Sequence, residues 1–141
     1  MKRKKLKNSL DVKFGESQLK PGGDNFDLTV QLFIKRKKLN GLRQKTLDWY
    51  ELMLNIFKQY LQKNSLNTAP VAITREMIED FILGLRENGN KAVSVNGKIR
   101  ALRVFFNFLE KEKIILNSPI RDIILLRDIE PVVPTFSEEQ L

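Results

Sequence analysis

The chain has 141 residues with a formal net charge of +8, and it contains neither cysteine nor histidine. This length suits one compact domain with flanking segments, and a hydrophobic content of 42% is enough to build a packed core. The missing cysteines exclude disulfides and thiolate metal sites, and the missing histidines remove the commonest general base and the usual zinc ligands. No apolar run approaches the ~20 residues that span a bilayer. We therefore expect no cofactor, no metal ion and no membrane partner.

The net positive charge is concentrated in the first third of the chain. Residues 1–45 hold 13 Lys or Arg and 4 Asp or Glu, a balance of +9, whereas residues 46–141 hold 12 and 13, a balance of −1. This uneven distribution favours a local docking surface for a polyanion over a basic segment that serves solubility alone. Residues 1–24 are predicted to be a basic flexible tail, because their lysines repel one another and Pro21-Gly22-Gly23 breaks any helix. Two interpretations of this tail stay open: an arm that contacts phosphates, or a terminus without a partner.

Two helices are predicted in the first half of the chain. The first spans residues 26–39, where polar residues at 24–27 can cap its start and Asn40-Gly41 supplies a left-handed stop. The second spans residues 46–63 and places aromatic and aliphatic side chains on one broad face and polar side chains on the other. We interpret the aromatic side chains as core rather than as a surface for base stacking.

Two more helices are predicted in the second half. The third begins near Thr74, which can cap it, and ends at about Arg86. Its outside is acidic, so we interpret it as a structural buttress that faces away from nucleic acid. The fourth begins between Lys91 and Ser94 and extends to about Lys113, with an apolar face along its length.

The chain after the fourth helix is predicted to leave the domain. Residues 120–126 are expected to form a short helix or a turn that closes the core, and Pro131-Val-Val-Pro134 is typical of an extended linker. Residues 135–141 have the pattern of another helix start, with Ser137 as the cap. We interpret residues 120–141 as a linker followed by the truncated start of a second domain.

Catalytic motifs are absent from the sequence. It has no glycine-rich phosphate loop, no histidine-based dyad and no cluster of metal ligands. Its carboxylates are spread over the predicted outer faces of helices rather than paired. We therefore assign no catalytic residue to this chain.

Two groups of polar and basic residues predict contacts with nucleic acid. Residues 35–45 hold six cations and no acid, and the second helix follows at Thr46 with free backbone N–H groups that favour an anion. A similar group opens the fourth helix at Ser94, and we expect the two helix starts to lie side by side and straddle a major groove. The alternative interpretation is that both groups are solvated helix ends. The candidate DNA-binding residues are Lys35, Arg36, Lys38, Arg43, Lys45, Thr46, Lys91, Ser94, Asn96, Lys98, Arg100 and Arg103.

Three stretches of the sequence carry a resemblance to a known family. They are Lys45-Thr-Leu-Asp-Trp-Tyr50 with Phe57-Lys-Gln-Tyr-Leu61, then Ile73-Thr-Arg-Glu-Met-Ile-Glu-Asp-Phe81, then Val93-Ser-Val-Asn-Gly-Lys-Ile-Arg-Ala-Leu-Arg-Val-Phe-Phe106. In this order and spacing, residues 29–119 resemble the N-terminal core-binding domain of tyrosine recombinases, the phage integrase and Xer-like group. Residues 134–141 are similar to the opening of the catalytic domain of that family.

The resemblance implies an all-α fold, a four-helix SAM-like bundle with a basic N-terminal tail and an extended C-terminal linker. It also implies that the second and fourth helices lie near the major groove, in one half of a C-shaped clamp on DNA. Gly97 departs from the family, where a larger polar residue is commoner. Glycine costs about 1 kcal/mol in a helix relative to alanine, and packing against another helix is the favoured reason for it, ahead of close approach of a backbone.

The resemblance divides the chain into a tail at 1–24, a DNA-binding domain at 25–119, and a linker with the truncated start of the catalytic domain at 120–141. The catalytic residues of the family belong to the following domain. Tyr50 and Tyr60 both fall on the second predicted helix and are not candidates for the nucleophile. We therefore expect this chain not to be an enzyme by itself, although its full-length parent is expected to be a tyrosine recombinase.

The expected function is to grip duplex DNA at a recombination site and so position a separate catalytic domain for integration or recombination. The expected partners are double-stranded DNA and other recombinase subunits on that DNA, with the isolated domain a monomer. The expected location is the cytoplasm, as a bacterial or phage protein associated with the nucleoid. The alternative function is a helical module for protein–protein interaction that does not bind DNA.

Overall fold

The computed structural model describes residues 21–127 of the chain. Within this range the regular elements are four α-helices and one short 3₁₀-helix, with no strand. They are α2 (Phe26–Leu39), α3 (Gln44–Lys63), η1 (Pro70–Ala72), α4 (Arg75–Glu87) and α5 (Ala92–Lys111). The prediction of an all-α fold with four helices is therefore confirmed.

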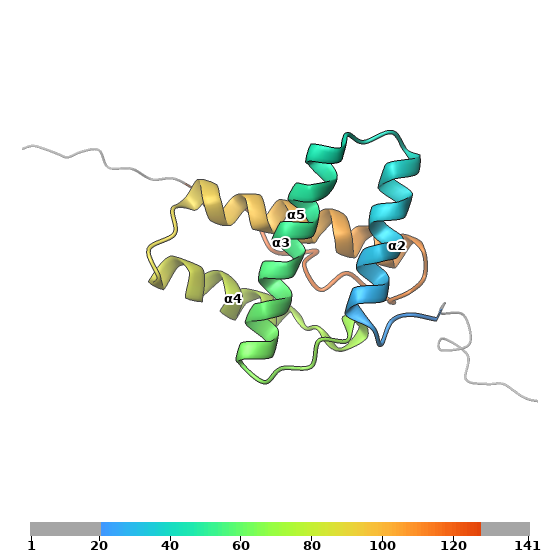
Figure 1. Ribbon diagram of the computed structural model, residues 1–141. Helices are drawn as coiled ribbons and strands as arrows, with labels where there is room; N and C mark the ends of the chain where they lie inside the picture. The colour runs from blue at the N-terminus through green and yellow to red at the C-terminus, as the bar shows by residue number, and fades with distance from the viewer. Residues whose placement is uncertain (1–20, 128–141) are drawn as a thin grey trace, which may run out of the picture.

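The four helices form two hairpins that cross. The first hairpin, α2–α3, lies over the second, α4–α5, and α5 packs against each of the other three helices (Figure 1). Within residues 21–127 no helix is both long enough and apolar enough to cross a membrane.

Two helix starts follow the capping pattern that the sequence predicts. Asn25 caps α2, because its side-chain oxygen accepts a hydrogen bond from the Leu28 N–H at 3.0 Å. Thr74 caps α4 in the same way, with the Met77 N–H donating to its Oγ1 at 3.2 Å. The predicted extent of α2 is identical to the observed one, and the cap predicted at Thr74 is confirmed.

The start of α3 differs from the prediction by two residues. Arg43 is the N-cap, with extended backbone angles of φ −71° and ψ 153°, and its side chain makes no capping hydrogen bond. Its carbonyl accepts the first bond of the helix, from the Leu47 N–H at 3.0 Å. Thr46 is therefore the third residue of α3 rather than its first. Gly41, with a positive φ of 90°, lies in the turn after α2, and the chain enters α3 three residues later, at Gln44.

The core is built around phenylalanine side chains from α2, α3 and α5. Phe33 is fully buried, and its ring lies within about 5.5 Å of the rings of Tyr50, Phe105 and Phe108. Edge-on contacts of this kind add to the stabilisation from burial. The aromatic side chains of α3 thus belong to the core, as predicted, except for Trp49, which is 38% exposed.

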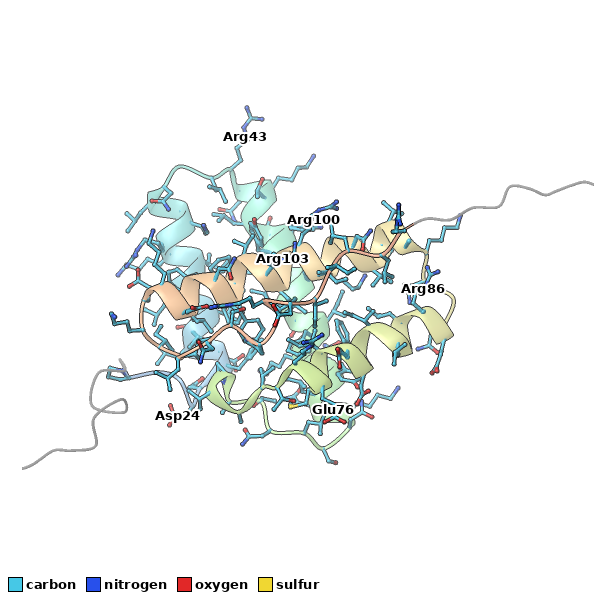
Figure 2. All side chains as sticks on the ribbon, turned by 180° about the vertical axis from the view of Figure 1, so that it is seen from behind. Asp24, Arg43, Glu76, Arg86, Arg100 and Arg103 are labelled. Carbon is cyan, nitrogen blue, oxygen red and sulfur yellow. The ribbon has the colours of Figure 1, made fainter. Side chains whose placement is uncertain are left out.

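The core extends past residue 119, where the sequence placed the end of the domain. The segment 118–127 starts with a turn and then returns along α5 toward the first residues of that helix (Figure 2). Ile120 and Ile123 on this returning segment are buried and belong to the main hydrophobic cluster. Of the two expectations for residues 120–126, a short helix or a turn that closes the core, the structure has the turn.

Candidate nucleic-acid interface

The first turn of α3 exposes backbone N–H groups and cations together. Because the first helical bond comes from Leu47, the N–H groups of Gln44, Lys45 and Thr46 have no partner within residues 21–127. The side chains of Arg43, Lys45 and Thr46 are exposed. Free N–H groups and the positive end of the helix dipole favour an anion at this position, and the two cations add to that preference.

The first turn of α5 is constructed in the same way. Lys91 is the N-cap and its side chain makes no capping bond, while its carbonyl accepts from the Val95 N–H at 3.0 Å. Ser94 is the third residue of α5, as Thr46 is of α3. The Lys98 Nζ donates to the Ser94 Oγ at 3.2 Å, so this hydroxyl already has a cationic neighbour. Each helix therefore begins with a cation at the cap and a hydroxyl at the third position.

Trp49 and Gly97 bring the two helix starts to the same side of the molecule. A Cβ placed on Gly97 would lie 3.7 Å from the Trp49 Cζ2, so the indole lies against the backbone of α5. Each of these residues is three positions after the hydroxyl of its helix, less than one turn of about 5.4 Å. In Figure 2, Arg43 and Arg100 lie toward one edge of the molecule, whereas Glu76 on α4 lies toward the opposite edge. A neighbouring helix therefore packs over Gly97, although a Cβ at this position would lie at an ordinary contact distance.

Asn96 and Arg103 are candidates whose side chains bind the protein itself. The Asn96 side chain makes two hydrogen bonds to the backbone of Leu126, at 2.9 Å to its carbonyl and 2.7 Å from its N–H. Arg103 donates to the carbonyl of Ile123 at 2.5 Å. Both side chains are half-buried and hold the returning segment 118–127 against α5.

Arg36 is a third candidate with a partner inside the protein. Its guanidinium donates to the Glu112 carboxylate at 2.6 Å and lies 5.7 Å from the centre of the Phe108 ring. Phe108 is 14 residues after Ser94 on α5, which corresponds to about 21 Å along the helix axis. Arg36 therefore lies near the far end of α5 from the two helix starts.

The remaining candidates have side chains without a protein partner in the part of the chain that the structure describes. Their side chains are exposed. They are Lys35, Lys38, Arg43, Lys45, Thr46, Lys91 and Arg100. Of these, Arg43, Lys45, Thr46 and Lys91 belong to the two helix starts, and Arg100 lies about two turns into α5. We call these five residues the basic edge.

Glu110 is a structurally important polar residue that the sequence analysis did not single out. It accepts from the Ser118 N–H at 3.1 Å and from the Arg121 guanidinium. The hydrogen bond from Arg121 is the main reason that the pKa of Glu110 lies below its ordinary value. Asn96, Arg103 and Glu110 are spaced seven residues apart, so they form one polar stripe along α5 that binds the returning segment. That spacing was visible in the sequence, but it does not say what covers the stripe.

No metal-binding cluster of side chains is seen among residues 21–127. They contain no group of three or more Asp or Glu side chains placed to hold a metal ion. Burial raises the pKa of Tyr60, and the Asp80 carboxylate raises it further. The phenol therefore stays protonated at neutral pH and packs beside the Phe81 ring in the core.

Comparison with known proteins agrees with this small helical architecture. Residues 31–113 match the family described as "Phage integrase, N-terminal SAM-like domain". The chain therefore belongs to this family, and its fold is a SAM-like helical domain as the sequence predicted.

Two curated relatives come from the bacterium Oceanobacillus iheyensis. One, named "Tyrosine recombinase XerC", is 29% identical over 119 residues, which cover 84% of this chain and 39% of the relative. The other, "Tyrosine recombinase XerD", is 29% identical over 79 residues, or 56% of this chain and 27% of the relative. The chain thus spans well under half the length of either relative. No solved structure gives a significant match to the chain.

Proposed function

We propose that this chain is the core-binding domain of a site-specific tyrosine recombinase, and that it grips duplex DNA so that a separate catalytic domain is positioned on the recombination site. The observation that supports this most directly is the contact between Trp49 and Gly97, which holds two anion-favouring helix starts on one side of the molecule. A duplex presents phosphates on both sides of its major groove, so two such starts can engage both strands.

Within this proposal, the direct contacts come from the basic edge. Arg43, Lys45 and Lys91 contact phosphates, while Arg100 has the length and the donors to reach a base edge. Asn96 and Arg103 contribute by fixing the returning segment, because each side chain already donates to a backbone carbonyl of that segment. The proposed partners are double-stranded DNA and further recombinase subunits on it, and the proposed location is the bacterial cytoplasm.

The salt dependence of duplex binding tests this proposal. Trp49 is the single tryptophan of the chain and lies beside the basic edge, so its fluorescence reports binding without a label. If each phosphate contact releases counterions, the logarithm of the binding constant falls with the logarithm of salt concentration by about 0.9 per contact. A binding constant that does not change with salt would contradict the proposal.

A chemical-shift titration with the same duplex locates the surface. The amides of residues 43–46 and 91–100 are expected to move, and those on the outer face of α4 are expected not to move. Shifts confined to α4 would reject the basic edge as the binding surface.

A protein-interaction module is the second candidate function, and the exposed leucines of α2 favour it. Leu28, Leu32 and Leu39 are 41%, 38% and 73% exposed, and apolar side chains grouped on one helix are typical of a protein contact. Sedimentation with and without duplex separates the two functions, since self-association in the absence of any DNA binding would favour the second.

A further inference from the structure

A second surface, away from the basic edge, combines apolar and acidic side chains in a groove. It lies between α4 and the returning segment, is open to solvent and has a volume of about 570 Å³. We call it the α4 groove, and its main lining residues are Glu76, Asp80, Leu83, Asp122, Ile124 and Leu126. Leu83 and Ile124 are 58% and 78% exposed although they line the same groove. Large apolar side chains that gather in one exposed hollow with a charged rim are typical of a site that another segment covers.

The rim of the α4 groove is strongly acidic. Four carboxylates line it, from Glu76, Glu79, Asp80 and Asp122, together with a single cation, Arg75. Arg75 joins the two walls, because its guanidinium lies 3.1 Å from the Glu79 carboxylate and 3.8 Å from that of Asp122. The groove therefore favours an occupant that carries both apolar and positively charged side chains.

The two ends of the chain outside the described residues differ in charge. Residues 1–20, the N-terminal segment, hold seven Lys or Arg and two acidic residues, with leucine, valine and phenylalanine between them. Residues 128–141 hold four acidic residues and no cation. Only the N-terminal segment is complementary to the α4 groove in charge, and it also supplies apolar side chains for Leu83 and Ile124.

The N-terminal segment joins the domain at Pro21, which lies beside Leu32, Phe108 and Ile114 rather than in the groove. A chain of 20 residues spans up to roughly 65 Å when extended, so its length does not limit where it docks on the domain.

We propose that the N-terminal segment docks into the α4 groove of its own chain, with its lysines on the acidic rim and its apolar side chains on Leu83 and Ile124. The same lysines are attractive to a polyanion, so docking withholds them from DNA until DNA competes for them. That last consequence rests on the proposed function, whereas the docking itself is independent of it.

A spin label on the N-terminal segment tests the docking without DNA. The chain has no cysteine, so Ser9→Cys supplies a single thiol for a nitroxide in the full chain. The expected result is paramagnetic broadening of the backbone amides of Asp80, Leu83 and Ile124, with residues 43–46 unaffected. Absence of broadening in the groove, or broadening of the basic edge in its place, would overturn the proposal.

Two controls make the result specific. Asp80→Lys with Leu83→Ser, both at exposed positions, should abolish the broadening, whereas Glu87→Lys makes the same change of charge on α4 outside the groove and should leave it intact. Raising salt to about 1 M, where the Debye length is about 3 Å, should at least halve the broadening. Equal loss in both variants would count against the groove as the docking site.

A mixed sample separates the chain's own segment from that of a second copy. Labelled chains without ¹⁵N are mixed with ¹⁵N-labelled chains without the nitroxide. Docking within one chain predicts no broadening in this mixture, and broadening that appears there and grows with concentration would overturn the proposal in favour of a second copy. DNA binding by the basic edge is measured separately, so either idea can fail alone.

Discussion

The starts of α3 and α5 share a cation at the cap and a hydroxyl at the third position, but the polar side chains that follow on the two helices have different surroundings. On α3 the side chains of Arg43 and Lys45 are exposed and have no partner within residues 21–127. On α5 the neighbouring Asn96 and Arg103 are bonded to the returning segment. The difference arises because another stretch of chain covers one flank of α5, while the first turn of α3 faces solvent. The residue type indicates which groups a side chain can bind. The packing around the side chain determines whether it is available to an outside partner or is already bonded within the protein.

The largest expected effect is on DNA binding by the α3 start. Replacing Arg43 and Lys45 together by alanine should weaken duplex binding by about tenfold for each lost phosphate contact at low salt, and lower the salt slope by about 0.9 per contact. Binding is measured by Trp49 fluorescence over a salt series. The matched control, Lys63→Ala with Lys111→Ala, removes the same charge at the far ends of α3 and α5. If the two double variants weaken binding equally, the effect is due to net charge, and the α3 start has no special role in DNA binding.

Substitutions in the polar stripe of α5 should lower the stability of the fold rather than weaken DNA binding. Arg103→Ala leaves the Ile123 carbonyl without its charged donor, which should lower the free energy of unfolding by about 1.5–3 kcal/mol. Asn96→Ala removes two hydrogen bonds to Leu126 and should cost about 1–3 kcal/mol. Urea denaturation measures both, and hydrogen exchange should show faster exchange of the Leu126 amide. A normal stability combined with a reduced salt slope would mean that these residues contact DNA after all.

Two glycines give opposite expectations for stability. Gly97→Ala adds a Cβ at an ordinary contact distance of 3.7 Å from Trp49, so the gain in helix propensity should stabilise the fold by about 0.5–1 kcal/mol. Gly23→Ala places a Cβ 2.5 Å from the Val71 Cγ1 and 3.0 Å from the Ile114 carbonyl, and should destabilise by about 1–3 kcal/mol. Thermal unfolding compares them. A destabilised Gly97→Ala variant would show that α3 and α5 lie closer together than the contact indicates.

The smallest expected effect is on the loss of folding stability at acidic pH. The folded-state pKa of Glu110 lies below its ordinary value of 4.5, chiefly because of the hydrogen bond from Arg121. A carboxyl group with a lowered pKa contributes stability above its unfolded pKa, and this contribution is lost as the pH falls through the folded pKa. Glu110→Gln should therefore lose less stability than the parent between about pH 5 and pH 3. Parallel curves of stability against pH would show that this pair contributes nothing measurable.

The sequence predicted features whose signals are local. Asn25 and Thr74 are side-chain caps within three residues of the N–H groups they bind, so the starts of α2 and α4 followed from short-range rules. The start of α3 was placed two residues too late, because Thr46 is a residue type that suits a helix start. The observed helix begins after Arg43, whose side chain makes no capping bond, so no local side-chain signal marks the true start.

The parts that the sequence could not predict depend on distant partners. Asn96 and Arg103 contact residues 30 and 20 positions further along, and neither pairing has a local pattern. A polar residue beside an apolar helix face is compatible with solvent, with DNA or with a returning chain. The acidic outer face of α4 was anticipated as a buttress, but the groove beside it depends on Asp122 and Ile124, which belong to that same returning segment.

The returning segment also sets the length of any connection made after it. Leu126 is fastened to Asn96, so the backbone continues from Arg127 close to the first turns of α5. A domain joined after Arg127 would be tethered to this fixed point. The shorter its tether, the higher its effective concentration near the basic edge. Release of residues 118–127 would add ten residues to the tether, roughly 35 Å of extended chain, and would lower the effective concentration of the attached unit while every DNA contact of the basic edge stays the same.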